Sequence, residues 1–238
     1  MAPQSRAPTI LLTRPEAQSD RFAAVLAQRF PGVTVLSSPL IAPQYLRPIL
    51  PDQACAAVIF TSQTAVMSAR RIVADGAALP RLAFCVGDQT ASAATAAGFT
   101  AISAQGGGLA LAHWILAQQV TGPLLYLHGA EPRVDLATIL NSAGIQTFST
   151  VSYAQIAQSL TPAATAALQG GNPVVAPIFS ARTGQILAAE YARIGGVAPL
   201  YVAGLSAEAA VAVPATALQL AMRPDSAAML VAMAVWLT

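Results

Sequence analysis

Lysine is missing from the sequence, and charges of either sign are scarce. All twelve basic residues are arginine, and charged residues make up 9% of the 238 residues, against about a quarter in an average soluble domain. The formal net charge is +2, and Arg70 and Arg71 form the only adjacent basic pair. Because a nucleic-acid groove requires clustered basic residues, the sequence predicts no nucleic-acid partner.

Long uninterrupted apolar runs are missing as well, although 55% of the residues are hydrophobic. A membrane-spanning helix needs about 20 consecutive apolar residues. The uncharged stretch 136–181 is interrupted by Asn141, by glutamines and by prolines. The first residues carry no apolar segment of the secretory type. These absences predict a cytoplasmic protein without a membrane partner.

Cysteine and histidine occur only twice each. Cys55 and Cys85 lie in apolar, strand-like surroundings, where buried thiols are expected rather than a disulfide or a metal site. Neither a glycine-rich dinucleotide fingerprint nor a phosphate-binding loop is present. Two histidines and scattered carboxylates do not make a set of metal ligands. The sequence therefore predicts neither a metal nor a cofactor.

What the sequence does contain is a regular alternation of short apolar runs and alanine-rich helical stretches. The apolar runs are 9–12, 33–36, 56–60, 82–86, 124–127, 146–151, 174–179 and 200–203. The helical stretches are 16–29, 63–74, 90–97, 109–119, 133–141, 162–168, 183–193, 207–211 and 226–237. This alternation predicts an α/β fold, with a parallel sheet covered by helices on both faces.

The chain also resembles itself at spacings of 112 to 119 residues (127 − 12 = 115 for the first pair). The matching segments are 12–16 with 127–131, 60–64 with 179–183, 86–91 with 202–207, and 31–33 with 143–145. A repeat of this length is a domain rather than a solenoid unit. The proline-rich stretch 38–51 and the stretch 149–159 are candidate crossings, so we expect two similar α/β domains, one of them built from both chain ends.

Small polar residues follow the predicted strands, where helices begin. In a doubly wound sheet, ligands bind at the carboxyl ends of the strands, and free N–H groups at helix N-termini favour anions. Ordinary helix capping explains such residues equally well at any single position. Their recurrence in both repeats favours an anionic ligand. The residues are Thr13, Arg14, Thr61, Ser62, Asp88, Gln89, Thr90, His128, Gly129, Ser180, Arg182, Thr183 and Ser206.

Tyr153 follows the apolar run 146–151 at the second crossing. An aromatic hydroxyl at this position has two interpretations. It faces a gap between the domains and meets a ligand, or it is a half-buried tyrosine that contributes only packing.

Over nearly its whole length the chain resembles the uroporphyrinogen-III synthase family. The similar segments are LLTRPEAQSDRFAAVL, VIFTSQTAV, FCVGDQTASAATAAGF, LLYLHGAEPR, VSYAQ, PIFSARTGQIL and YVAGLSAEAAVAV, in that order. One position departs from the family pattern, because the family usually carries arginine where His128 stands.

The resemblance implies two flavodoxin-like parallel-sheet domains joined by a two-stranded hinge. The first would be discontinuous, 1–37 plus 155–238, and the second would be 42–149. The hinge would lie near 38–41 and 150–154.

The resemblance also implies an activity, the cyclisation of hydroxymethylbilane to uroporphyrinogen III with inversion of the last pyrrole ring and loss of water, through a spiro-pyrrolenine and without a cofactor. Tyr153 would be the acid that assists hydroxyl loss, and hydroxymethylbilane synthase a partner for substrate handover. The predicted substrate-binding residues are Thr13, Arg14, Ser62, Thr90, His128, Gly129, Arg133, Ser180, Arg182 and Ser206.

Two other function classes remain open at this stage. A non-catalytic two-lobe binding protein for an anionic small molecule would share the fold and the polar strand ends. A transferase that uses a nucleotide sugar would also have two α/β domains, but the missing phosphate loop and the short length disfavour it.

Overall fold

The structure is a computed structural model that describes residues 8–210 and 212–237. Each predicted helical stretch corresponds to a helix, although several ends shift. The last residue predicted for one helix, Val211, lies outside the described residues. The helices are α1 (Glu16–Arg29), α2 (Gln63–Ala74), α3 (Asp88–Ala96), α4 (Gly108–Ala117), α5 (Leu136–Ser142), α6 (Pro162–Gln169), α7 (Ala181–Arg193), α8 (Ala207–Ala210) and α9 (Ser226–Ala234).

Each predicted apolar run corresponds to a strand, but three strands, β3, β6 and β11, were not predicted. All three are edge strands of at most five residues, and β3 carries Pro43, which is tolerated at a sheet edge. The strands are β1 (Thr9–Leu12), β2 (Val35–Ser37), β3 (Ile41–Tyr45), β4 (Ala57–Phe60), β5 (Leu82–Cys85), β6 (Thr100–Ser103), β7 (Leu124–Gly129), β8 (Thr147–Ala157), β9 (Val174–Ile178), β10 (Leu200–Gly204) and β11 (Ala217–Leu220).

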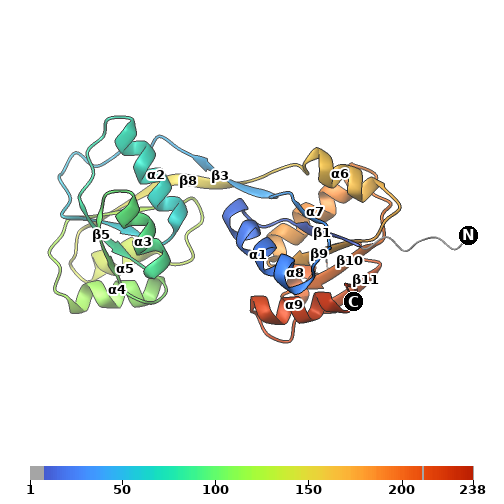
Figure 1. Cartoon of the computed structure of the whole chain (residues 1–238). Coiled ribbons are helices and arrows are strands. Elements are labelled where there is room, and N and C mark those ends of the chain that lie inside the picture. Colours follow the sequence, from blue (N-terminus) through green and yellow to red (C-terminus); the bar gives the residue numbers. More distant parts are fainter. Residues whose placement is uncertain (1–7, 211, 238) are drawn as a thin grey trace, which may run out of the picture. The chain divides into compact units, whose positions relative to one another are not determined.

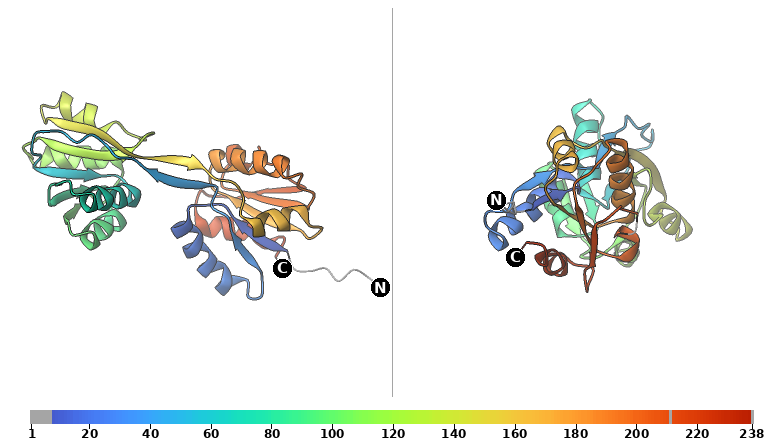
Figure 2. Two further views of the ribbon diagram at one scale, coloured as in Figure 1. Left: turned by 90° about the horizontal axis from the view of Figure 1, so that it is seen from above. Right: turned by 90° about the vertical axis from the view of Figure 1, so that its right-hand side faces the viewer.

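The chain folds as two compact units. Unit 1 contains the chain up to Ala42 and from Ile156 onward, and unit 2 contains Pro43–Gln155 (Figure 1). The sheet of unit 1 has the order β11-β10-β9-β1-β2, and its pairs are parallel. Apolar side chains of α6, α7 and α8 cover one face of this sheet, and those of α1 and α9 cover the other. Figure 2 shows this layered arrangement from above.

Unit 2 has the sheet order β3-β8-β7-β4-β5-β6. Its β4, β5, β6, β7 and β8 pair in parallel. Side chains of α2 and α3 pack on one face, and those of α4 and α5 pack on the other. The strand β4 is buried at all four positions, as expected for a central parallel strand with helices on both sides.

The two sheets share one strand arrangement, but the chain enters each sheet at a different strand. The repeats found in the sequence pair β1 with β7, β2 with β8, β9 with β4, and β10 with β5. Read across the sheets, β2-β1-β9-β10-β11 in unit 1 matches β8-β7-β4-β5-β6 in unit 2. The matched segments therefore occupy equivalent strand positions, and the internal similarity follows from a shared architecture.

Two strands carry the chain across the boundary between the units. The first crossing runs along β3 and the return runs along β8, and these strands are neighbours in the sheet. The N–H of Leu46 donates to the Ser152 carbonyl at 3.0 Å, and the N–H of Gln158 donates to the Leu40 carbonyl at 2.9 Å. This pairing extends β8 to Ala157, so the prediction that Tyr153 follows the strand was wrong: Tyr153 lies inside it.

Candidate functional site

Each sheet has a topological switch point, where the connections from adjacent strands run in opposite directions. In unit 2 the switch lies between β4 and β7, and in unit 1 it lies between β1 and β9. Ligands of doubly wound folds bind at the carboxyl ends of the strands at such points. The polar residues singled out in the sequence lie at both: Thr61, Ser62, His128 and Gly129 in unit 2, and Thr13, Arg14 and Ser180 in unit 1.

Ser62 and Tyr153 meet at the switch point of unit 2. Ser62 is the N-cap of α2, and its Oγ accepts the N–H of Ala65 at 3.1 Å. The hydroxyl oxygen of Tyr153 lies 3.0 Å from the same Oγ, and either hydroxyl can donate. Tyr153 is 8% exposed, so its ring is held in the core while its hydroxyl reaches the end of the sheet.

Gly129 makes room for the Tyr153 ring. A Cβ at position 129 would lie 2.8 Å from two ring carbons of Tyr153 and 3.0 Å from its hydroxyl oxygen. The backbone supports the same arrangement, because the N–H of Ala130 donates to the Tyr153 carbonyl at 2.9 Å. The register between β7 and β8 shifts at this point, where Gly129 pairs with Tyr153. The glycine is therefore a steric requirement of the tyrosine position.

His128 is engaged within unit 2. Its Nδ1 lies 2.7 Å from the Gly129 carbonyl oxygen, and its Nε2 lies 2.7 Å from the Oγ of Ser149. The imidazole is 6% exposed and stacks on the Tyr126 ring at a centroid distance of 4.5 Å. Both ring nitrogens thus have partners inside the unit, and the side chain links the end of β7 to the first part of β8.

Tyr126 was missed by the sequence analysis although it lies beside the site. Its hydroxyl is 3.4 Å from the Thr61 Oγ1, and its side chain is 2% exposed. Burial raises the pKa of Tyr126, the hydrogen bond from Thr61 acts in the opposite direction, and the charges of Tyr153 and Asp135 raise it further. A signal was available, because Tyr126 and His128 alternate along one strand and therefore share a face of the sheet.

The remaining predicted residues of unit 2, Thr90 and Arg133, differ in burial. Thr90 is buried in the first turn of α3, whose N-cap, Gly87, has no side chain to offer. Arg133 is exposed in the loop before Asp135. The prediction that a helix begins at Arg133 was wrong, because Asp135 caps α5 by accepting the Thr138 N–H at 3.0 Å.

In unit 1, Ser180 repeats the role of Ser62. It caps α7, accepts the Thr183 N–H at 3.2 Å and pairs with the Thr183 hydroxyl at 2.9 Å. Ser206 accepts the N–H of Ala209 at 3.3 Å at the start of α8. Arg182 lies exposed in the first turn of α7. These helix starts carry free backbone donors of the kind that bind carboxylates.

Thr13 and Arg14 follow β1, and their side chains lie in different environments. Thr13 is 1% exposed, and its Oγ1 has no hydrogen-bond partner among the described residues. The guanidinium carbon of Arg14 lies 3.9 Å from the centroid of the Phe179 ring, a cation–π contact. Burial, followed by the nearby charge of Arg21, lowers the pKa of Arg14. The switch point of unit 1 thus carries a buried hydroxyl and an arginine packed on an aromatic ring.

The family model described as uroporphyrinogen-III synthase HemD matches residues 20–203. The chain belongs to the uroporphyrinogen-III synthase family. Its structure is similar to the crystal structure of uroporphyrinogen-III synthetase from Helicobacter pylori 26695, with a TM-score of 0.60 and 18% sequence identity over 96% of this chain and 99% of that one. At this identity the similarity is one of fold. No curated protein sequence matches the chain at a significant level.

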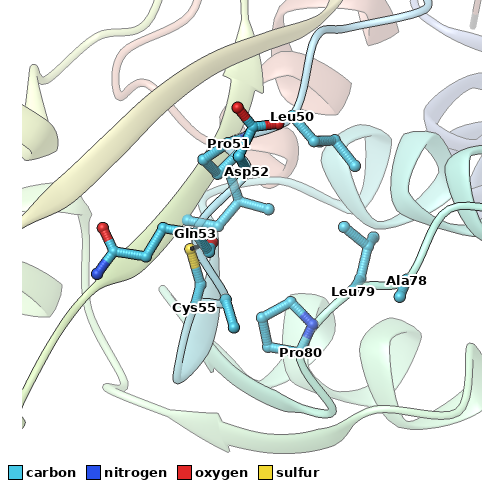
Figure 3. A pocket seen from close by; sticks show the side chains of 10 residues that line it. Leu50, Pro51, Asp52, Gln53, Cys55, Ala78, Leu79 and Pro80 are labelled. Atoms are coloured by element: carbon cyan, nitrogen blue, oxygen red, sulfur yellow. Dashed lines mark hydrogen bonds between the residues drawn. The ribbon is translucent and has the colours of Figure 1, made fainter.

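One cavity of this uroporphyrinogen-III synthase family member lies at the end of the unit-2 sheet opposite to Tyr153 and Ser62. It measures about 380 Å³ and is lined by loop residues including Leu50, Cys55, Leu79 and Pro80. Figure 3 shows these side chains beside the start of β4. The cavity therefore lies at the amino ends of the unit-2 strands, whereas Tyr153 and Ser62 lie at the carboxyl ends.

Two further findings concern metal binding and membrane insertion. Among residues 8–210 and 212–237, no group of three or more histidine, cysteine or acidic side chains is arranged to hold a metal ion. Over the same residues, none of the helices combines the length and the apolar character needed to cross a bilayer.

Proposed function

We propose that Tyr153 is the acid that assists hydroxyl loss in the reaction of the uroporphyrinogen-III synthase family, the cyclisation of hydroxymethylbilane to uroporphyrinogen III. The observation that carries this proposal is the 3.0 Å contact between the Tyr153 hydroxyl and the Ser62 Oγ at the carboxyl ends of the unit-2 strands. Ser62 already accepts the N–H of Ala65 and still has its own proton to donate. When Ser62 donates to the Tyr153 oxygen, the phenolic proton is free for a leaving group.

The proton balance of the reaction needs one donor and no oxidant or reductant. The terminal carbon–oxygen bond of the bilane breaks, the hydroxyl takes the proton of Tyr153, and water leaves. The resulting azafulvenium cation, which keeps its pyrrole N–H, is attacked by the substituted carbon of the far ring, which gives the protonated spiro-pyrrolenine. Fragmentation and reclosure invert that ring, and the proton lost when the pyrrole regains its aromaticity restores the Tyr153 hydroxyl. The substrate supplies most of the reactivity, so the protein contributes orientation and one placed acid.

The substrate carries eight carboxylates, and both switch points offer groups that bind them. We assign substrate carboxylates to the helix N-termini behind Ser62, Thr90, Ser180 and Ser206, where backbone N–H groups are free. Arginine adds charge-assisted hydrogen bonds. The further members of this proposed set are Thr13, Arg14, Gly129, Arg133 and Arg182. His128 is left out of the direct contacts because both of its ring nitrogens have partners.

The instability of hydroxymethylbilane bears on where the protein acts and on how it receives its substrate. Without enzyme, hydroxymethylbilane closes to the uninverted isomer, so it must be used where it is made. This supports a cytoplasmic site of action and transfer from hydroxymethylbilane synthase. The domain boundaries 1–37 plus 155–238 and 42–149, with a hinge near 38–41 and 150–154, remain part of the proposal.

The decisive experiment uses the whole chain. The protein is incubated with freshly prepared hydroxymethylbilane, the products are oxidised, and the porphyrin isomers are separated. Predominance of isomer III supports the proposed function. Isomer I in the proportion formed without protein, together with saturable binding of the bilane, would instead make the chain a non-catalytic binding protein.

A further inference from the structure

Unit 1 contains a cavity beside the start of α1, in addition to the cavity already described in unit 2. A cavity of about 220 Å³ is lined by Arg14, Gln18, Arg21, Phe22, Val25 and Ser226. It lies between α1 and the N-terminus of α9, beside the carboxyl end of β1. Two of its lining side chains are arginines.

Helix geometry separates Arg21 from the acidic residues in the first half of α1. Gln18, Arg21 and Phe22 are spaced at i, i+3 and i+4, so they share one face of α1. At about 100° per residue, Glu16 and Asp20 lie on the opposite face. Within the described residues, neither Arg14 nor Arg21 has a carboxylate within ion-pair distance.

Arg14 is held in place before any ligand arrives. Its guanidinium lies over the Phe179 ring at 3.9 Å, and its Nε donates to the Oε1 of Gln18 at 3.1 Å. In the part of the chain that the structure describes, the terminal nitrogens of this guanidinium donate no hydrogen bond. A planar group fixed in this way loses little entropy when it forms a bidentate pair with a carboxylate.

The acidic residue that precedes α9, Asp225, already has partners. Asp225 caps α9 by accepting the Ala228 N–H at 2.8 Å, and it pairs with Arg223 at 3.4 Å. Among residues 8–210 and 212–237, Arg14 and Arg21 therefore have no acidic partner, and their mutual repulsion, after burial, lowers the pKa of Arg14. An anion between the two guanidinium groups would relieve this repulsion.

We propose that the cavity between α1 and α9 is a carboxylate subsite, in which Arg14 and Arg21 together hold one acetate or propionate side chain of the tetrapyrrole. The inference rests on the proposed function and adds Arg21, which no sequence pattern had marked, to the binding residues. Its volume of about 220 Å³ suits a side chain of this size and is too small for a pyrrole macrocycle. Arg21 acts in binding and not in the chemical step.

Kinetics of isomer III formation test the subsite. Arg21→Gln is expected to raise KM for hydroxymethylbilane about fivefold, the scale of one exposed charge pair, with kcat and the isomer III to I ratio unchanged. Arg21→Lys keeps the charge and is expected to restore most of the affinity. Arg29→Gln, the matched control, removes an exposed arginine from the last turn of the same helix and is expected to leave KM unchanged.

The two proposals fail in different ways. If the wild-type protein yields isomer III but Arg21→Gln has the wild-type KM, the subsite is wrong and the proposed function stands. If Arg29→Gln raises KM as much as Arg21→Gln, the effect is one of general charge and the subsite is again wrong. If the wild-type protein yields only the spontaneous isomer ratio, the proposed function itself is overturned.

Discussion

The Tyr153 ring lies against the α-carbon of Gly129, so close that a Cβ there would stand 2.8 Å from two of its carbons. This contact joins two neighbouring strands at the switch point of unit 2 and sends the tyrosine hydroxyl to Ser62. A residue without a side chain thus determines where the proposed acid lies.

Gly129→Ala is therefore expected to impair isomer III formation strongly while the chain still folds. The added methyl group must displace the Tyr153 ring, because a rigid strand backbone cannot move away from it as a flexible side chain would. We expect kcat to fall at least as far as in Tyr153→Phe. Gly171→Ala is the control, since a Cβ there would meet nothing within 4 Å. Equal kcat for Gly129→Ala and the wild-type protein would contradict the steric argument.

Tyr153→Phe is expected to lower kcat about a hundredfold without abolishing turnover, which is the low end of what one placed acid contributes, because the substrate supplies the rest. Tyr191→Phe is a matched control. The Tyr191 hydroxyl donates a hydrogen bond to the Ala198 carbonyl at 3.0 Å. The Tyr153 hydroxyl has a hydrogen bond of the same length, 3.0 Å, with the Ser62 Oγ. Steady-state assays with isomer separation measure both variants. Wild-type turnover in Tyr153→Phe would remove its catalytic role.

The two thiols are expected to differ in reactivity and in their effect on stability. Burial raises the pKa of Cys85 from about 9 to about 11, and Cys85 is fully buried, whereas Cys55 is partly accessible. Since the thiolate is the nucleophile, a disulfide reagent at pH 8 should modify Cys55 first and Cys85 only after denaturation. Rapid modification of both thiols in the native protein would rule this out.

The same shift predicts a pH dependence. The folded state keeps the Cys85 proton longer than the unfolded state, so stability is present below pH 9 and is lost as the pH rises toward 11. Denaturant unfolding of Cys85→Ala should show a flatter decline across this range than the wild-type protein. Identical slopes for Cys85→Ala and the wild-type protein would show that Cys85 does not cause the loss of stability at high pH.

Glu190 is expected to stabilise unit 1 at neutral pH. Its carboxylate accepts the Leu160 N–H at 2.8 Å and two bonds from Arg193, at 2.6 and 2.7 Å. The hydrogen bond from Arg193 chiefly lowers the pKa of Glu190, so this stability is present above the ordinary glutamate pKa and is lost as the pH falls through the folded value. Glu190→Gln should lower the free energy of unfolding by about 1 kcal/mol at pH 7.

Acid should remove the difference between Glu190→Gln and the wild-type protein, and urea unfolding at pH 7 and pH 3 measures this. Glu208→Gln, which changes an exposed carboxylate in α8, is the control and should show little effect at either pH. A difference that persists unchanged at pH 3 would assign the effect to packing instead of charge.

The helices were the part of the fold most open to prediction. The starts of α1 and α2 were predicted at Glu16 and Gln63, because proline or serine immediately before a helical stretch marks its beginning. The edge strands β3, β6 and β11 escaped prediction, since short strands with partly exposed faces show neither a continuous apolar run nor clear alternation. Their assignment depends on a neighbouring strand, which a local pattern does not reveal.

By itself, the sequence determined the alternating α/β architecture, its internal repeat and its family, because local periodicity and residue order carry this information. Only the tertiary structure decided that Tyr153 lies within a strand, against Gly129 and beside Ser62, that Tyr126 contacts Thr61, and that Arg21 lines a cavity with Arg14. Ser62 and Tyr153 are 91 residues apart in the chain. Contacts over such separations depend on strand register, which is set by pairing across the whole sheet.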